Sequence, residues 1–109
     1  MHPREGDFPR RLRGLSRTTI AGVRYPVATT RLSRLLGLAL LGRGRAGPGL
    51  VIPRCRSVHT FGMRFALDVF FLDVEGRFIS RRPAVPPNRI VSEPRASAVL
   101  EVPSQCALR

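Results

Sequence analysis

The chain has 109 residues, of which 43% are apolar, and this length allows one small domain with a single modest core. Its richest apolar run, residues 35–41, is much shorter than the roughly 20 residues that cross a bilayer. No apolar segment follows the basic N-terminus as it would in a secretory signal. We therefore expect a cytoplasmic protein without a membrane span.

The charge is strongly positive, with 19 basic and 7 acidic residues and a formal net charge of +12. Every basic residue is an arginine, and they are spread along the chain except for a cluster between residues 10 and 17. This distribution favours a solvated basic surface produced by a coding preference for arginine. It leaves open an acidic partner or nonspecific binding of nucleic acid.

Residues 1–20 are rich in arginine, proline and glycine and show little periodicity, which predicts a flexible basic arm. Residues 21–109 are expected to form one domain. Cys55 and Cys106 belong to no CxxC motif, and without an export signal we expect two free thiols rather than a disulfide. Neither a cofactor nor a metal site is predicted.

The first elements of the domain are a strand and a helix. Residues 21–30 alternate as a strand does. Residues 31–42 are predicted to form the main helix, ending at Gly42, because apolar residues recur at helical spacing. That apolar stripe consists of Leu32, Leu35, Leu36, Ala39 and Leu40.

The rest of the domain is predicted to be mostly strand. We expect strands over residues 49–53, 59–65, 66–73, 76–82 and 97–103. Between two of them, Asp73 and Gly76 have the properties of a tight turn, because Asp bonds nearby backbone and Gly adopts positive φ. A proline-rich excursion of about a dozen residues follows residue 82. The fold class is therefore α+β, with a small, mostly antiparallel, curled or barrel-like sheet and one main helix.

Alternation over residues 66–73 assigns side chains to two faces of a strand. One face holds Leu67, Val69 and Phe71, and the other holds Asp68, Phe70 and Leu72. A carboxylate among these apolar residues needs a hydrogen-bond partner. The partners nearest to Asp68 in sequence are His59, Thr60, Arg64 and local backbone N–H groups.

The stretch SVHTFGMRFALDVFFLD, residues 57–73, is the candidate site, because it carries many polar groups within an apolar strand region. The first interpretation is a structural polar cluster. The second is a small pocket with Arg64 as an anion-binding group and Asp68 or His59 as a base. The ligand-binding candidates are Thr60, Met63 and Arg64, and the catalytic candidates are His59, Asp68 and Cys55.

A soft-metal site from Cys55, His59 and Met63 is a third interpretation, because thiolate, imidazole and thioether suit copper(I). Successive members are four residues apart, which is about 13 Å on an extended chain. That separation is too large for one ion unless the chain folds back, so no metal site is assigned.

The segments GPGLVIP, SVHTFGMRFALDVFFLDVEGRF and AVLEVP together resemble domain of unknown function 192, a family of small bacterial and archaeal proteins. The resemblance covers about residues 21–103. It implies a compact α+β domain with a curled, barrel-like sheet, and it implies no activity. Where family members continue with Pro-Ala-Gly after the last strand, this chain has PSQCALR.

We interpret the sequence as a binding or accessory module rather than an enzyme. An enzyme that uses His59, Arg64 and Asp68 is the first alternative. The second alternative is an arginine-driven, nonspecific binder of nucleic acid or of acidic surfaces.

Overall fold

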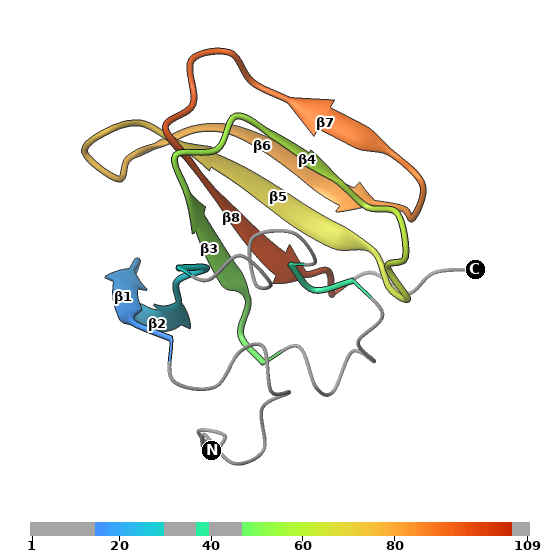
Figure 1. The fold of residues 1–109 in the computed structure, drawn as a ribbon, viewed down its shortest axis with the longest axis horizontal. Coiled ribbons are helices and arrows are strands. Elements are labelled where there is room, and N and C mark those ends of the chain that lie inside the picture. The colour runs from blue at the N-terminus through green and yellow to red at the C-terminus, as the bar shows by residue number, and fades with distance from the viewer. Residues whose placement is uncertain (1–14, 30–36, 40–46, 106–109) are drawn as a thin grey trace.

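The structure, a computed structural model, describes residues 15–29, 37–39 and 47–105. Its regular elements are eight strands (Figure 1): β1 (Arg17–Ile20), β2 (Val23–Pro26), β3 (Leu50–Pro53), β4 (Ser57–His59), β5 (Leu67–Leu72), β6 (Phe78–Val85), β7 (Ile90–Ser92) and β8 (Ala98–Pro103). In these ranges no helix has the length and apolar character that a bilayer span requires.

The predicted α+β class is wrong for the described residues, which form an all-β fold without a helix. Of the helix expected over residues 31–42, the structure describes only residues 37–39, which form a turn. Gly37 has a φ of 52°, in the left-handed region that does not continue a right-handed helix. The spacing of apolar residues in the sequence does not predict this change of backbone conformation. Leu38, which lies off the predicted apolar stripe, is fully buried.

One four-stranded antiparallel sheet forms the centre of the fold, with the strand order β3-β8-β5-β6. Two short antiparallel ribbons, β1–β2 and β4–β7, accompany it. The β1–β2 ribbon meets the outer edge of β3 through a parallel bridge between Val27 and Val51. The sequence predicts that the residues of β1 belong to the flexible arm, but in the structure they pair with β2. The predicted helix residues Leu35 and Leu36 lie outside the described ranges.

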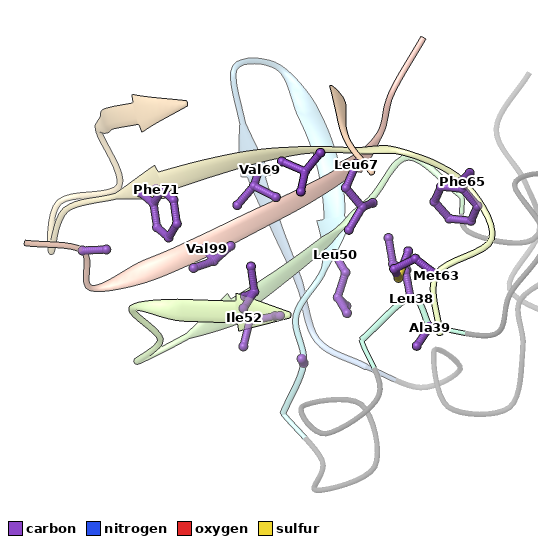
Figure 2. Close-up of a cluster of buried hydrophobic side chains, with 14 of the residues drawn as sticks. Leu38, Ala39, Leu50, Ile52, Met63, Phe65, Leu67, Val69, Phe71 and Val99 are labelled. Atoms are coloured by element: carbon purple, nitrogen blue, oxygen red, sulfur yellow. The ribbon is translucent and has the colours of Figure 1, made fainter. Parts of the chain in front are cut away.

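The main core lies on one face of the central sheet, which we call the inner face. It contains Leu67, Val69 and Phe71 of β5 together with Val99 of β8, as alternation predicted for β5. Figure 2 shows Phe71 toward one end of this cluster and Leu38 and Met63 toward the other. The β4–β7 ribbon adds Val58 and Val91 to the cluster.

The opposite, outer face of the sheet carries a smaller apolar cluster. Leu72 of β5 and Leu100 of β8 pack there with Tyr25 of β2 and Val51 of β3. The two central strands, β5 and β8, therefore have apolar neighbours on both faces. A polar side chain on either strand needs a specific reason to be there.

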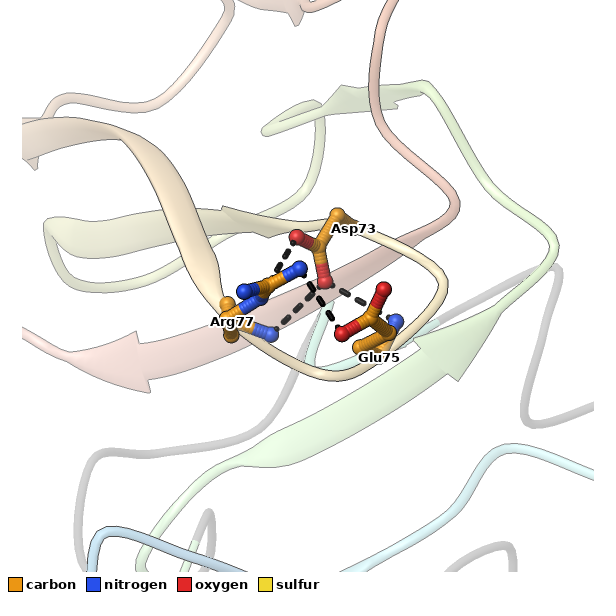
Figure 3. A network of polar contacts seen from close by, with 3 residues as sticks. All are labelled: Asp73, Glu75 and Arg77. Carbon is orange, nitrogen blue, oxygen red and sulfur yellow. Dashed lines mark hydrogen bonds and ion pairs between the residues drawn. The ribbon is translucent and has the colours of Figure 1, made fainter.

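The β5–β6 hairpin is closed by the turn that the sequence predicted (Figure 3). Oδ1 of Asp73 accepts the backbone N–H groups of Glu75 and Arg77, both at 2.9 Å. The Arg77 guanidinium bonds to the carboxylates of Asp73 at 3.2 Å and Glu75 at 2.7 Å. Gly76 has the expected positive φ, 80°. These bonds hold the pKa of Asp73 below its ordinary value, chiefly through the Arg77 N–H.

Candidate functional site

Thr60 is the best-buried polar residue of the predicted site, and its contacts are internal to the fold. Its hydroxyl donates to the carbonyl of Pro86 at 2.7 Å and accepts the N–H of Arg89 at 2.8 Å. Its own N–H donates to the carbonyl of Arg89 at 2.8 Å. The hydrogen bonds of Thr60 therefore connect the loop between β6 and β7 to the end of β4.

Asp68 is partnered through an irregularity in the neighbouring strand. Leu67 pairs with Val85 and Val69 pairs with Arg82, so two residues of β6 face Asp68 alone, which is a β-bulge. Within the bulge, Ala84 has a φ of 49°, and its N–H donates to Oδ1 of Asp68 at 2.8 Å.

The second oxygen of Asp68 lies 3.8 Å from Nη2 of Arg81. A partner was therefore correctly expected for Asp68, but it comes from β6 rather than from His59, Thr60, Arg64 or the local backbone. Asp68 satisfies a backbone group that the bulge would otherwise leave without an acceptor.

The remaining predicted residues lie in different surroundings. Met63 is buried in the main core. Cys55 is a half-buried free thiol that donates to the carbonyl of Ser57 at 3.2 Å, whereas Cys106 lies outside the described residues. Arg64 is exposed and makes no ion pair with the described carboxylates.

The predicted catalytic pairs are not joined in this structure. His59 bonds to the N–H of Phe61 at 3.2 Å, and neither Asp68 nor Cys55 is among its hydrogen-bond partners in the described ranges. The same ranges hold no group of three His, Cys, Asp or Glu side chains that could bind a metal ion. The polar groups of residues 57–73 thus divide between structural roles and the surface.

An exposed apolar and basic surface lies at the end of the β4–β7 ribbon, and we call it the ribbon-end surface. It consists of His59, Phe61, Arg89 and Ile90. The rings of His59 and Phe61 stack with centroids 5.3 Å apart and planes 21° apart. Ile90 is the cross-strand partner of His59 and is 65% exposed, and Phe61 is 48% exposed.

Arg89 precedes Ile90 in the chain, and its backbone is bonded to Thr60, which stands between His59 and Phe61. Its guanidinium donates to the carbonyl of Asn88 at 3.3 Å and forms no ion pair with a described carboxylate. An anion that approaches this surface therefore meets a cation not already neutralised by the described acidic groups.

Glu101 is a second polar feature, and the sequence interpretation missed it. It lies on β8 between Leu50 of β3 and Val69 of β5, on the inner face, and is only 3% exposed. Its Oε1 atom is buried without a hydrogen-bond partner. Burial raises the pKa of this carboxyl to about 7. At neutral pH the group is thus poised between its neutral and ionised forms.

Two glycines fit closely around Glu101. A Cβ atom on Gly37 would lie 2.8 Å from Oε1 of Glu101, and a Cβ on Gly49 would lie 2.4 Å from the Glu101 carbonyl oxygen. Such distances leave no room for a side chain at either position. The signal for Glu101 in the sequence was VLEVP itself, where a carboxylate stands within an apolar central strand.

Together, the described residues define a small domain built of strands, with an exposed aromatic and basic surface and a buried carboxyl group. The sequence profile of the DUF192 family, described as "Uncharacterized ACR", matches residues 13–109. The chain belongs to this family, as the resemblance in its sequence predicted.

One solved structure has a similar fold. It is described as a protein of unknown function from Novosphingobium aromaticivorans, with a TM-score of 0.58 and 18% sequence identity. The match covers 82% of this chain and 71% of that chain. At this identity the similarity concerns the fold alone. No match was found among curated proteins.

Proposed function

We propose that this domain is a binding module, and that its ribbon-end surface contacts single-stranded nucleic acid. The observation that carries the proposal is the exposed stack of His59 and Phe61 beside Ile90 and Arg89. Aromatic faces stack on unpaired bases, and arginine binds phosphate, so this combination suits an unpaired strand.

The overall charge supports an anionic partner. With a formal charge of +12, the chain attracts polyanions over a distance of about one Debye length, roughly 8 Å at physiological salt. Charge alone does not distinguish nucleic acid from an acidic protein. The aromatic stack favours nucleic acid, because an exposed π-face gains a specific contact from a base.

A binding role is also supported by the contacts that the candidate site residues make. Thr60 and Asp68 hold backbone groups of the loop after β6 and of the β6 bulge. His59 is oriented by the Phe61 N–H and not by a carboxylate. A general base normally has a partner that orients it toward substrate.

The experiment is a fluorescence anisotropy titration of the full chain with a labelled 12-nucleotide single strand and with the same sequence as a duplex. We expect tighter binding of the single strand, because the duplex hides the faces of its bases. Phe61→Ala should weaken single-strand binding roughly 5- to 100-fold, the range expected for the loss of one stacking contact. Arg89→Gln should reduce the salt dependence by about one phosphate contact.

Phe78→Ala is the matched control, because Phe78 is similarly exposed at 50% but packs against Phe70 on the central sheet. It should leave binding unchanged. Equal losses for Phe61→Ala and Phe78→Ala, or no preference for the single strand, would overturn the proposal. An acidic peptide that competes better than the oligonucleotide would also overturn it, and would make the partner a protein.

A further inference from the structure

Glu101 has no role in the proposed binding surface, and its position within the core needs a separate explanation. The carboxyl group is on β8, which lies between β3 and β5, and it contacts the 37–39 turn. Its Oε1 atom meets no donor. Buried carboxyl oxygens are ordinarily hydrogen-bonded, so the unpartnered Oε1 indicates a state that depends on the protonation of the group.

The Glu101 carboxyl group and the 37–39 turn are close enough for the protonation of the carboxyl to affect the position of the turn. The Cα of Gly37 approaches Glu101 so nearly that an added Cβ would be 2.8 Å from Oε1. Leu38 and Ala39, the next two residues, are buried in the inner-face core. The neutral carboxyl is compatible with these apolar neighbours. The ionised form needs water or a donor, and reaching either requires the turn to move.

We propose that Glu101 and the 37–39 turn form a proton-operated switch, in which the turn packs on the protonated carboxyl and separates from it when the proton is lost. Among the described residues, no charged group contributes to the pKa shift of Glu101, which is caused by burial. The described elements against it present Leu50 from β3, Val69 from β5 and Leu38 from the turn.

Two other titratable groups lie on elements packed against this region. Asp68 of β5 is on the opposite face of the sheet and is held by Ala84 and Arg81. Tyr25 of β2 lies against Gly49, and burial raises the pKa of its hydroxyl, so it stays neutral at pH 7. Tyr25 therefore does not replace Glu101. The switch therefore depends on one carboxyl.

The test is site-resolved amide hydrogen exchange of the full chain at several pH values, with protection factors corrected for the intrinsic pH dependence of exchange. A group that titrates near 7 when covered and near 4.5 when open should reduce the protection of Leu38 and Ala39 about tenfold between pH 6 and pH 8. In Glu101→Gln, which cannot ionise, protection should be the same at both pH values. Asp68→Asn, the matched control, should behave as the parent does.

A carboxyl ¹³C titration of Glu101 in the unmodified protein provides a second readout that needs no variant. Its midpoint should coincide with the pH at which the turn loses protection. The proposal is overturned if protection falls equally in Glu101→Gln, if the two midpoints differ by more than about one pH unit, or if the turn is unprotected at pH 6.

Discussion

Two carboxyl groups on the neighbouring central strands β5 and β8 differ in their hydrogen bonding. Asp68 on β5 points to the outer face, where it accepts the Ala84 N–H and lies near the Arg81 guanidinium. Glu101 on β8 points to the inner face, where one of its oxygens has no partner. Their positions differ by one residue in register, since Val69 is the partner of Glu101.

The difference shows that the strand sequence alone does not decide whether a carboxyl group on a central strand finds a hydrogen-bond partner. Each stands among apolar residues of a central strand, so each has the same local pattern. What separates them is the strand beside them: β6 offers Asp68 a free N–H group at its bulge, whereas β3 and β5 offer Glu101 only apolar side chains. The available donors decide whether each carboxyl group has a partner.

The largest expected effect on stability comes from the apolar inner face of the sheet, on which Glu101 lies. Phe71 is the largest fully buried side chain there. Phe71→Ala should reduce the free energy of unfolding by about 3–5 kcal/mol, because it leaves a cavity in the core. This is a large share of the ~5–15 kcal/mol typical of a domain. Denaturant unfolding measures it, and Phe78→Ala, at an exposed site, should cost much less.

The pH dependence of stability should expose Glu101 directly. Its pKa rises from 4.5 in the unfolded chain to about 7 in the fold, so the folded state binds the extra proton between these values. Stability should therefore be complete below pH 4.5 and fall by about 3 kcal/mol as the pH rises through 7. Thermal melts of the parent and Glu101→Gln across this window would measure it. A parent curve that does not fall relative to the Glu101→Gln curve would contradict the expectation.

The partnered carboxyl should respond to a different kind of change. Asp68→Ala removes the acceptor of the Ala84 N–H and should reduce the free energy of unfolding by about 1–3 kcal/mol, because a half-buried donor is left unsatisfied. Asp68→Asn keeps an oxygen in that position and should cost less. Chemical denaturation of both variants compares them. If the alanine and asparagine substitutions reduce the free energy of unfolding equally, the hydrogen bond to the bulge does not contribute to stability.

The smallest expected effect concerns the exposed carboxylate of the hairpin turn. The Arg77 N–H and guanidinium lower the pKa of Asp73, so its contribution is present above its unfolded pKa and is lost as the pH falls through the lower, folded value. Asp73→Asn should therefore flatten the acid side of the stability curve below about pH 4. The substitution should leave the pH dependence of stability between pH 4.5 and 7 unchanged, because Glu101 determines it in that range.

The part of the fold that could be predicted rests on short-range rules. Alternation placed Val69 and Phe71 on the inner face, and Asp73 and Gly76 marked the turn correctly. The helix predicted over 31–42 is contradicted at the described residues 37–39, because periodicity records which residues are apolar and not the φ of Gly37.

The candidate site was harder to predict because its contacts are long-range. The partner of Asp68 is 16 residues away and exists because β6 bulges. Thr60 meets Arg89 across 29 residues. Glu101 was overlooked because VLEVP does not reveal that its strand lies between two others. These features depend on pairings that a single sequence does not display.

The bulge in β6 also determines how the central sheet ends. β6 is the last strand of the order β3-β8-β5-β6, so its outer edge is where a strand from another molecule would add. Pro83 has no N–H to donate, and the bulge that it forms with Ala84 shifts the register of the strand. Arg81 and Arg82 add like charge along this edge. A second copy of the chain therefore finds no continuous ladder there, and the feature that stabilises Asp68 also protects the sheet from edge-to-edge aggregation.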